Sequence, residues 1–170
     1  MREIRSKDNK IWKRCEQLTM RKYRDRSGLY LIEGENLLDE AIRNHVRIET
    51  VLVREDCQKA LPPEAADKAF LLDARLFDKL AQTVTSQGIL AVVAKAEVRK
   101  EDFIGLPGSN FIVLDRLQDP GNIGTILRTA DAAGYRLAIL MKGTADVYAP
   151  KVVRAATGSL FRMPVVSMAS

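Results

Sequence analysis

Short apolar runs alternate with amphipathic stretches along this chain of 170 residues. Runs with the length of buried strands lie at residues 29–32, 48–53, 69–72, 89–94, 111–114, 137–141 and 161–166. Between them, apolar residues recur at spacings of three and four, which predicts helices at residues 9–23, 35–44, 76–80, 122–133 and 150–157. Strands that alternate with helices indicate an α/β fold with a parallel or mixed sheet.

A change of composition separates the chain into two such arrays. The segment AEVRKED is charged, and glycine, proline and serine follow it before the next apolar run. We therefore predict a first α/β domain at residues 1–96, a linker at 97–108 and a second domain at 109–170.

The stretch from Phe111 to Gly134, FIVLDRLQDPGNIGTILRTADAAG, predicts a strand, a turn and a helix in succession. Its apolar start suits a parallel sheet that buries the strand on both faces. The apolar stripe of the helix contains Ile123, Ile126, Leu127, Ala130 and Ala133. The polar side chains that face elsewhere are those of Asn122, Thr125, Arg128 and Thr129.

Gly124 lies one turn before Arg128 on this helix, and its missing side chain lets a ligand or another backbone come close. Ligands in open α/β folds bind beyond the carboxyl ends of the strands, where the loop before this helix lies. Asn122, Gly124 and Arg128 therefore predict a binding site. An ordinary helix with an exposed arginine is the alternative.

Positive charge is concentrated at the start of the chain. Residues 1–26 hold ten Lys or Arg against four Asp or Glu, while the net charge of the whole chain is only +5. Such a local excess predicts contact with a polyanion, most simply RNA, and a solvated basic helix without a partner is the alternative. The candidate RNA-binding residues here are Lys10, Lys13, Arg14, Arg21, Lys22, Arg24 and Arg26. The polar loop at 83–88 is a further candidate, although a plain connection explains it equally well.

Other classes of protein find little support in the sequence. Cys15 and Cys57 are far apart and His45 has no ligand-like neighbours, so we expect reduced thiols and no metal site. No apolar run has the length of a membrane span, and the start of the chain has no signal-peptide core. Neither a G-x-G-x-x-G nor a Walker motif is present, so a nucleotide-binding fold is a poor rival.

Three segments in the same order resemble the SpoU-type RNA ribose methyltransferases of the SPOUT superfamily. NIGTILRTADAAG is similar to the first signature motif, and DVYAPKVVRAATGSLFRMPVV is similar to the second. YLIEGENLLDEAI and LAQTVTSQGILAVV resemble the substrate-binding domain that often precedes the SpoU domain. The third motif, with a Gly-Glu pair and a Ser-Leu-Asn run, is not present in the 170 residues. The resemblance implies a small amino-terminal α/β RNA-binding domain followed by a partial SPOUT, or α/β knot, methyltransferase domain.

The resemblance also implies a reaction and residues for it. A methyl group passes from S-adenosylmethionine to a ribose 2′-hydroxyl of ribosomal or transfer RNA. Arg128 and Asn122 match the catalytic positions, with Arg128 as a clamp on the phosphate beside the ribose and Asn122 orienting the ribose. Lys151 and Arg154 of the second motif could line the RNA approach, and a plain exposed helix face is the alternative.

Three further expectations follow from this resemblance. The cofactor-binding residues should lie in the carboxyl-terminal knot beyond the second motif, so the 170 residues alone should be inactive. The complete protein should form a homodimer, and it should be cytoplasmic. A non-catalytic RNA-binding protein derived from the same family is the alternative function.

Overall fold

The computed structural model describes residues 2–83, 86–98 and 110–168. Its internal contacts divide the chain into an amino-terminal unit, residues 1–95, and a carboxyl-terminal unit, residues 96–170. Most of the predicted linker, 97–108, lies outside the described residues. The α/β fold class is confirmed, since strands and helices alternate in both units.

The amino-terminal unit contains a five-stranded mixed sheet with the strand order β1-β4-β3-β5-β2. Strands β1, β4 and β3 are parallel, whereas β5 runs antiparallel to both β3 and β2. The strands are β1 (Arg2–Ile4), β2 (Leu29–Glu33), β3 (Ile48–Arg54), β4 (Ala69–Leu72) and β5 (Ile89–Ala94).

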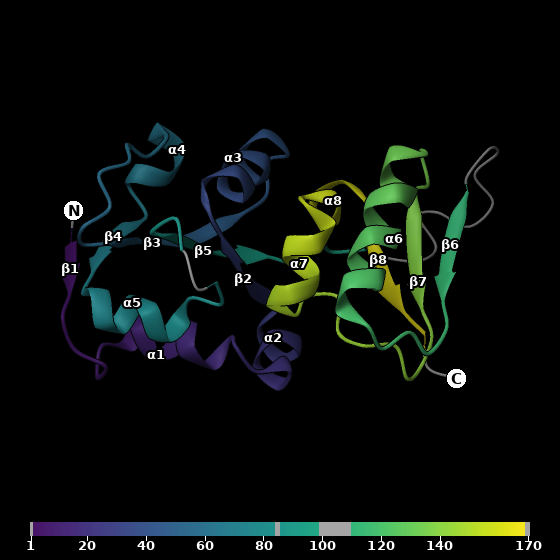
Figure 1. The fold of residues 1–170 in the computed structure, drawn as a ribbon, viewed down its shortest axis with the longest axis horizontal. Coiled ribbons are helices and arrows are strands. Elements are labelled where there is room, and N and C mark those ends of the chain that lie inside the picture. Colours follow the sequence, from purple (N-terminus) through teal and green to yellow (C-terminus); the bar gives the residue numbers. More distant parts are fainter. Residues whose placement is uncertain (1, 84–85, 99–109, 169–170) are drawn as a thin grey trace. The chain divides into compact units, whose positions relative to one another are not determined.

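Helices cover both faces of this sheet (Figure 1). One face carries α1 (Lys10–Gln17), α2 (Arg21–Ser27) and α5 (Ala74–Leu80), and the other carries α3 (Glu35–Arg43) and α4 (Pro63–Ala66). On the first face Trp12 and Cys15 of α1 enter a core with Leu76 and Phe77 of α5. The indole Nε1 of Trp12 also donates a buried hydrogen bond of 3.2 Å to the Leu76 carbonyl. Burial of this inner face leaves the basic residues of α1 on the outside.

The predicted helix at 9–23 is wrong in its extent. The first helix ends at Gln17, and a separate helix, α2, spans Arg21–Ser27. Leu18 closes the first helix by donating to the Arg14 and Cys15 carbonyls, and a positive φ at Gly28 ends the second. The short edge strand β1 was not predicted, because Ile4 is its only buried residue.

The carboxyl-terminal unit contains a three-stranded parallel sheet, β6-β7-β8. Its strands are β6 (Phe111–Leu114), β7 (Leu137–Leu140) and β8 (Val165–Ser167). The helices between them are α6 (Pro120–Ala132), α7 (Pro150–Ala156) and α8 (Ser159–Arg162). Each strand thus continues through a helix into the next parallel strand, as the alternating pattern predicted.

Two details of the second unit differ from the sequence prediction. The run at 161–166 was predicted as a strand, but Phe161 and Arg162 complete the short helix α8, and the strand starts only after Pro164. Strand β6 lies at the edge of its sheet and is not buried on both faces, since Val113 is 56% exposed. No helix in the described part of the chain has the length and apolar character to cross a membrane.

Candidate active site and nucleic-acid interface

Helix α6 starts directly beyond the carboxyl end of β6. Asp119 is its N-cap, and its carboxylate accepts a hydrogen bond of 2.7 Å from the Asn122 amide. Pro120 occupies the first turn, where its missing N–H is tolerated. The predicted turn, residues 119–121, is therefore the start of helix α6. The bond to Asp119 fixes the backbone of Asn122 in the first turn of this helix.

The loops that follow β6 and β7 are held together by hydrogen bonds. The Leu114 carbonyl accepts from the Met141 amide at 2.9 Å and from the Thr144 hydroxyl at 2.8 Å. The Leu117 carbonyl accepts from the Ala145 amide at 2.8 Å. These bonds fix the edge of the sheet beside which α6 begins, so Asn122 projects from a rigid support.

Asn122 and Arg128 are both exposed on α6. In the part of the chain that the structure describes, neither side chain makes a hydrogen bond or an ion pair with another residue. Six residues of helix separate them, which corresponds to a rise of about 9 Å and roughly one and two-thirds turns. The two side chains therefore leave the helix about 120° apart around its axis, and they do not converge on one atom.

Gly124 serves packing between helices. It is buried, and a β-carbon added to it would lie 2.3 Å from the β-carbon of Ala155 in α7. Of the two possibilities that the sequence left open, the close approach of another backbone explains this glycine. Ile126 is only half-buried and Ala133 is exposed, so the buried stripe of α6 is narrower than predicted.

The turn between α7 and α8 has an unusual backbone. Thr157 has φ 46° and Gly158 has φ 87°, and a β-branched residue rarely adopts a positive φ. Within the described residues, two buried polar atoms near this turn have no hydrogen-bond partner, Nη1 of Arg154 and Oγ of Ser159. The guanidinium of Arg154 is thus partly withdrawn from the surface on which we expected RNA, whereas Lys151 is exposed.

Tyr148 lies in the loop before α7. Its burial, together with the negative charge of Asp146, raises the pKa of the phenol to about 12. Tyr148 is therefore neutral at physiological pH and cannot act as a base without a further change in its surroundings.

Some basic residues of α1 and α2 form ion pairs with carboxylates of the same unit, and others do not. Lys13 pairs with Asp8 at 2.9 Å, Arg14 with Glu49 at 3.7 Å, and Arg21 with Asp25 at 3.4 Å. Their partners are surface carboxylates, which exchange readily for phosphate because exposed ion pairs are weak.

Three more cations of this surface have no carboxylate partner among the described residues: Lys10, Lys22 and Arg26. The ammonium of Lys22 lies 4.9 Å from the centre of the Tyr23 ring. Lys10 and Arg26 are exposed and are therefore the most available of the predicted RNA contacts.

Arg24 does not lie on this surface. Its side chain is only 4% exposed, and Nη1 donates to the Leu18 carbonyl at 2.8 Å and to the Thr19 carbonyl at 2.7 Å. These carbonyls end α1, so Arg24 joins α2 to the end of the preceding helix. The geometry gives Arg24 a structural position in place of the RNA-facing one that charge alone suggested.

Two family models match the chain. The MRM3-like substrate binding domain matches residues 9–91, and the SpoU rRNA Methylase family matches residues 109–170. Among curated proteins, the chain is 34% identical over 166 residues to the 23S rRNA (guanosine(2553)-2′-O)-methyltransferase RlmP of Bacillus subtilis. It is 38% identical over 157 residues to the mitochondrial rRNA methyltransferase 3 of Xenopus tropicalis.

Solved structures show the same similarity. The AdoMet-bound rRNA methyltransferase from Sinorhizobium meliloti matches 99% of the chain with a TM-score of 0.84 and 28% identity. The SpoU methyltransferase AviRb from Streptomyces viridochromogenes, in complex with AdoMet, matches 95% with a TM-score of 0.81 and 29% identity. The chain spans 65% and 64% of these two structures. The match to the Bacillus relative includes 98% of the chain and 65% of that protein. The match to the Xenopus protein includes 86% of the chain and 37% of that protein.

Proposed function

The chain belongs to the SpoU rRNA methylase family, and on that basis we propose that it serves the transfer of a methyl group from S-adenosylmethionine to a ribose 2′-hydroxyl of RNA. Ribosomal RNA is the favoured substrate, because the Bacillus and Xenopus relatives are named as rRNA methyltransferases. The observation that carries the proposal is the pair of exposed side chains, Asn122 and Arg128, on a helix that starts from a rigid loop at the carboxyl edge of the sheet.

Arg128 is proposed to position the target ribose and to stabilise the negative charge that develops on its 2′-hydroxyl. A ribose 2′-hydroxyl is a weak nucleophile, so the reaction gains from holding it in line and from stabilising the charge that develops as its proton leaves. An arginine keeps its proton, with a pKa above about 12, and is a poor base. Its planar guanidinium instead fits a phosphate through two hydrogen bonds. We assign Arg128 to the phosphate beside the target ribose and Asn122 to the ribose itself.

The cofactor would supply the methyl group. We propose that residues of the third motif hold S-adenosylmethionine, as the family resemblance implies. Residues 1–170 alone should show no saturable binding of S-adenosylmethionine in calorimetry.

The partners and place of action are further proposals. The basic face of α1 and α2 is proposed to contact the RNA backbone, and the complete protein is proposed to form a homodimer. The Bacillus relative acts on bacterial 23S rRNA by its name, which favours the cytoplasm, although related proteins are named as mitochondrial.

The experiment that tests the function removes the gene from its organism and maps ribose methylation. We expect one 2′-O-methylated position of ribosomal RNA to lose its methyl group when the gene is deleted. The wild-type gene should restore it, and a gene with Arg128→Ala should not, although its protein accumulates normally. An unchanged methylation map in the deletion strain would favour the alternative, a non-catalytic RNA-binding protein.

A further inference from the structure

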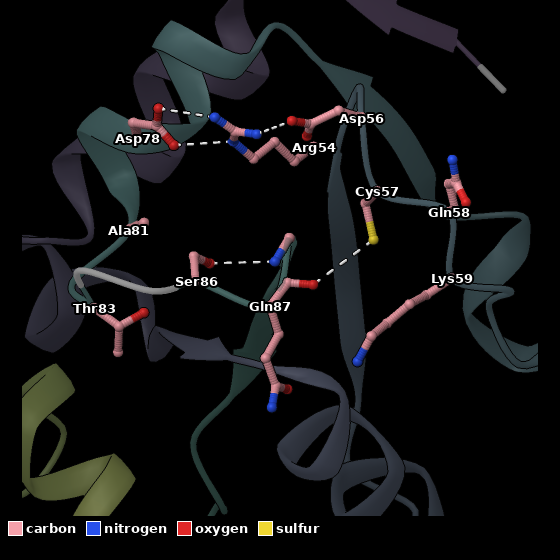
Figure 2. Close-up of a pocket in the computed structure, with 11 residues that line it drawn as sticks. Arg54, Asp56, Cys57, Gln58, Lys59, Asp78, Ala81, Thr83, Ser86 and Gln87 are labelled. Atoms are coloured by element: carbon pink, nitrogen blue, oxygen red, sulfur yellow. Dashed lines mark hydrogen bonds and ion pairs between the residues drawn. The ribbon is translucent and has the colours of Figure 1, made fainter.

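A pocket of about 850 Å³ lies in the amino-terminal unit, and none of the basic residues of α1 and α2 is among those that line it. Its walls come from the end of β3 and the loop after it, from the end of α5, and from the loop that leads into β5 (Figure 2). Arg54, Cys57, Lys59, Asp78 and Gln87 are among the residues that line it. A pocket for a drug-sized ligand typically has a volume of about 300–1,000 Å³, so this one has room for a small molecule or a nucleoside.

The cations of the pocket are neutralised by neighbouring carboxylates. The Arg54 guanidinium donates to both carboxylate oxygens of Asp78, at 3.0 and 3.1 Å, and also pairs with Asp56 (Figure 2). The ammonium of Lys59 pairs with Glu35. The two cations of the lining, Arg54 and Lys59, are matched in number by Asp56 and Asp78, so the pocket has no excess of positive charge to attract a phosphate and suits a neutral ligand.

Amide and hydroxyl groups provide hydrogen-bonding capacity on the same walls. Gln58 is exposed and makes no hydrogen bond with the described part of the chain. Gln87 accepts a hydrogen bond from the Glu35 amide through Oε1 at 3.0 Å, which leaves the N–H groups of its own amide as donors. Ser86 accepts from the Gly88 amide at 3.3 Å and keeps its hydroxyl proton to donate. Cys57 and Ala81 add small, less polar surfaces between these groups.

The residues that directly follow α5 on one wall of the pocket are held by hydrogen bonds. Glu33 accepts from the Gln82 amide at 2.9 Å and from the Thr83 hydroxyl. A side chain at Gly88 would place its β-carbon 2.9 Å from the β-carbon of Cys57, so the glycine lets the two walls meet. A wall fixed in this way loses little conformational entropy when it binds a ligand.

We propose that this pocket binds an unstacked nucleobase of the RNA substrate. The inference rests on the proposed RNA-binding function and adds a base-binding site to the charged backbone contacts. Sequence-specific proteins read single-stranded RNA by hydrogen bonds to the edges of splayed bases, and the amide and hydroxyl groups that line the pocket offer donors and acceptors for such bonds. The basic surface of α1 and α2 binds phosphate, and the pocket selects the base that enters it.

Cys57 offers a direct probe of occupancy. It is partly exposed in the pocket, whereas Cys15 is buried, so N-ethylmaleimide should modify Cys57 selectively. The alkylation rate would be followed by mass spectrometry with single-stranded RNA hexanucleotides of each base and with an abasic hexanucleotide of the same backbone. Binding of each oligonucleotide would be measured in parallel by filter retention.

We expect at least one base-bearing oligonucleotide to slow alkylation of Cys57 in a saturable manner, and the abasic strand to leave the rate unchanged although it is retained on the filter. Equal protection by the abasic strand, or retention of every strand without protection, would overturn the pocket assignment alone. If no RNA is retained, both the pocket and the RNA-binding function are overturned.

A pair of matched variants separates the pocket from the rest of the surface. Gln58→Ala should weaken protection by the preferred oligonucleotide by about twofold to tenfold, the value of one hydrogen bond, without changing the thermal midpoint. Glu64→Ala removes an exposed side chain of similar length from α4, outside both the pocket lining and the basic surface of α1 and α2, and should leave the concentration for half-protection within about twofold of that for the wild type. Equal effects of the two substitutions would contradict the assignment.

Discussion

A β-carbon on Gly124 would lie 2.3 Å from the β-carbon of Ala155 and 2.9 Å from its carbonyl carbon. Helices α6 and α7 therefore approach each other through backbone at this point, and only a residue without a side chain fits. The contact sets the position of the helix that carries Asn122 and Arg128. Gly124 thus affects the proposed active site through the packing of its supporting helix.

Gly124→Ala should destabilise the carboxyl-terminal unit. Alanine is favoured over glycine in a helix by about 1 kcal/mol, but forcing a methyl group into a filled contact costs typically 1–3 kcal/mol and more when backbone must move. We expect a net loss of about 1–2 kcal/mol, measured as the shift of the urea midpoint by circular dichroism.

Thr125→Ala is the matched control for Gly124→Ala. Thr125 is exposed on the same helix, so its replacement should change the free energy of unfolding by less than about 0.5 kcal/mol. Adding Ala155→Gly to Gly124→Ala should recover part of the loss, because it removes the nearer of the two clashing atoms. Full stability of Gly124→Ala alone would mean that α6 and α7 do not pack as described.

Arg128→Lys tests the proposed phosphate clamp. Lysine keeps the charge but loses the two parallel donors, so the rate of methyl transfer should fall by about tenfold to a thousandfold. The measurement is single-turnover methylation of the mapped RNA by protein expressed from its own gene. Cofactor affinity should change little, and a rate near that of the wild type would show that the fork geometry is not used.

Lys10 and Arg26 should contribute to RNA affinity more than their paired neighbours do. Each is exposed and lacks a carboxylate partner among the described residues, so it releases no internal ion pair when it binds phosphate. Lys10→Ala and Arg26→Ala should each lower the log–log salt slope of RNA binding by somewhat less than about one. Unchanged affinity and slope in filter-binding titrations would exclude the α1–α2 surface as the backbone contact.

The strands and helices of the core could be predicted from the sequence because each has a local signal. Strands β2 and β5 are continuous apolar runs, which predicted them at 29–32 and 89–94. The break between α1 and α2 could not be predicted. At this break the Arg24 guanidinium bonds to carbonyls five and six residues earlier, and no periodic pattern records such a bond.

Site prediction was limited in the same way. The helical pattern singled out Asn122 and Arg128 as site residues and motif similarity added their catalytic roles; both are exposed, and these assignments stay predictions. Net charge alone could not separate Arg24, which is buried, from Arg26, which is exposed. The pocket near Cys57 was not predicted, because its walls come from segments separated by up to 34 residues, Arg54 to Gly88, and only the fold brings them together.

Arg24→Ala should destabilise the amino-terminal unit without a specific effect on RNA binding. The substitution leaves the Leu18 and Thr19 carbonyls without their charged donor, and a hydrogen bond to a charged group contributes about 1.5–3 kcal/mol. We expect a loss in that range in urea unfolding, with the salt slope of RNA binding unchanged. Arg26→Ala, two residues away, should show the reverse pattern. If Arg24→Ala lowers the slope and leaves stability intact, the guanidinium contacts RNA after all.

Cys15 should make the amino-terminal unit less stable in alkaline solution. Burial raises the pKa of its thiol from the ordinary value of 9.0 to about 12, with a small opposing effect from Arg14. As the pH rises above about 9, the unfolded chain loses this proton while the folded chain keeps it, so the free energy of unfolding falls, by at most about 1.4 kcal/mol per pH unit. Fluorescence of Trp12, the single tryptophan and a member of the same core, reports this unfolding.

Cys15→Ala should be less stable at neutral pH because of the cavity, yet its urea midpoint should depend less on pH between about 9 and 11. Cys57→Ala removes a partly exposed thiol and should retain the wild-type dependence. An identical pH dependence in Cys15→Ala would show that the buried thiol is not the titrating group.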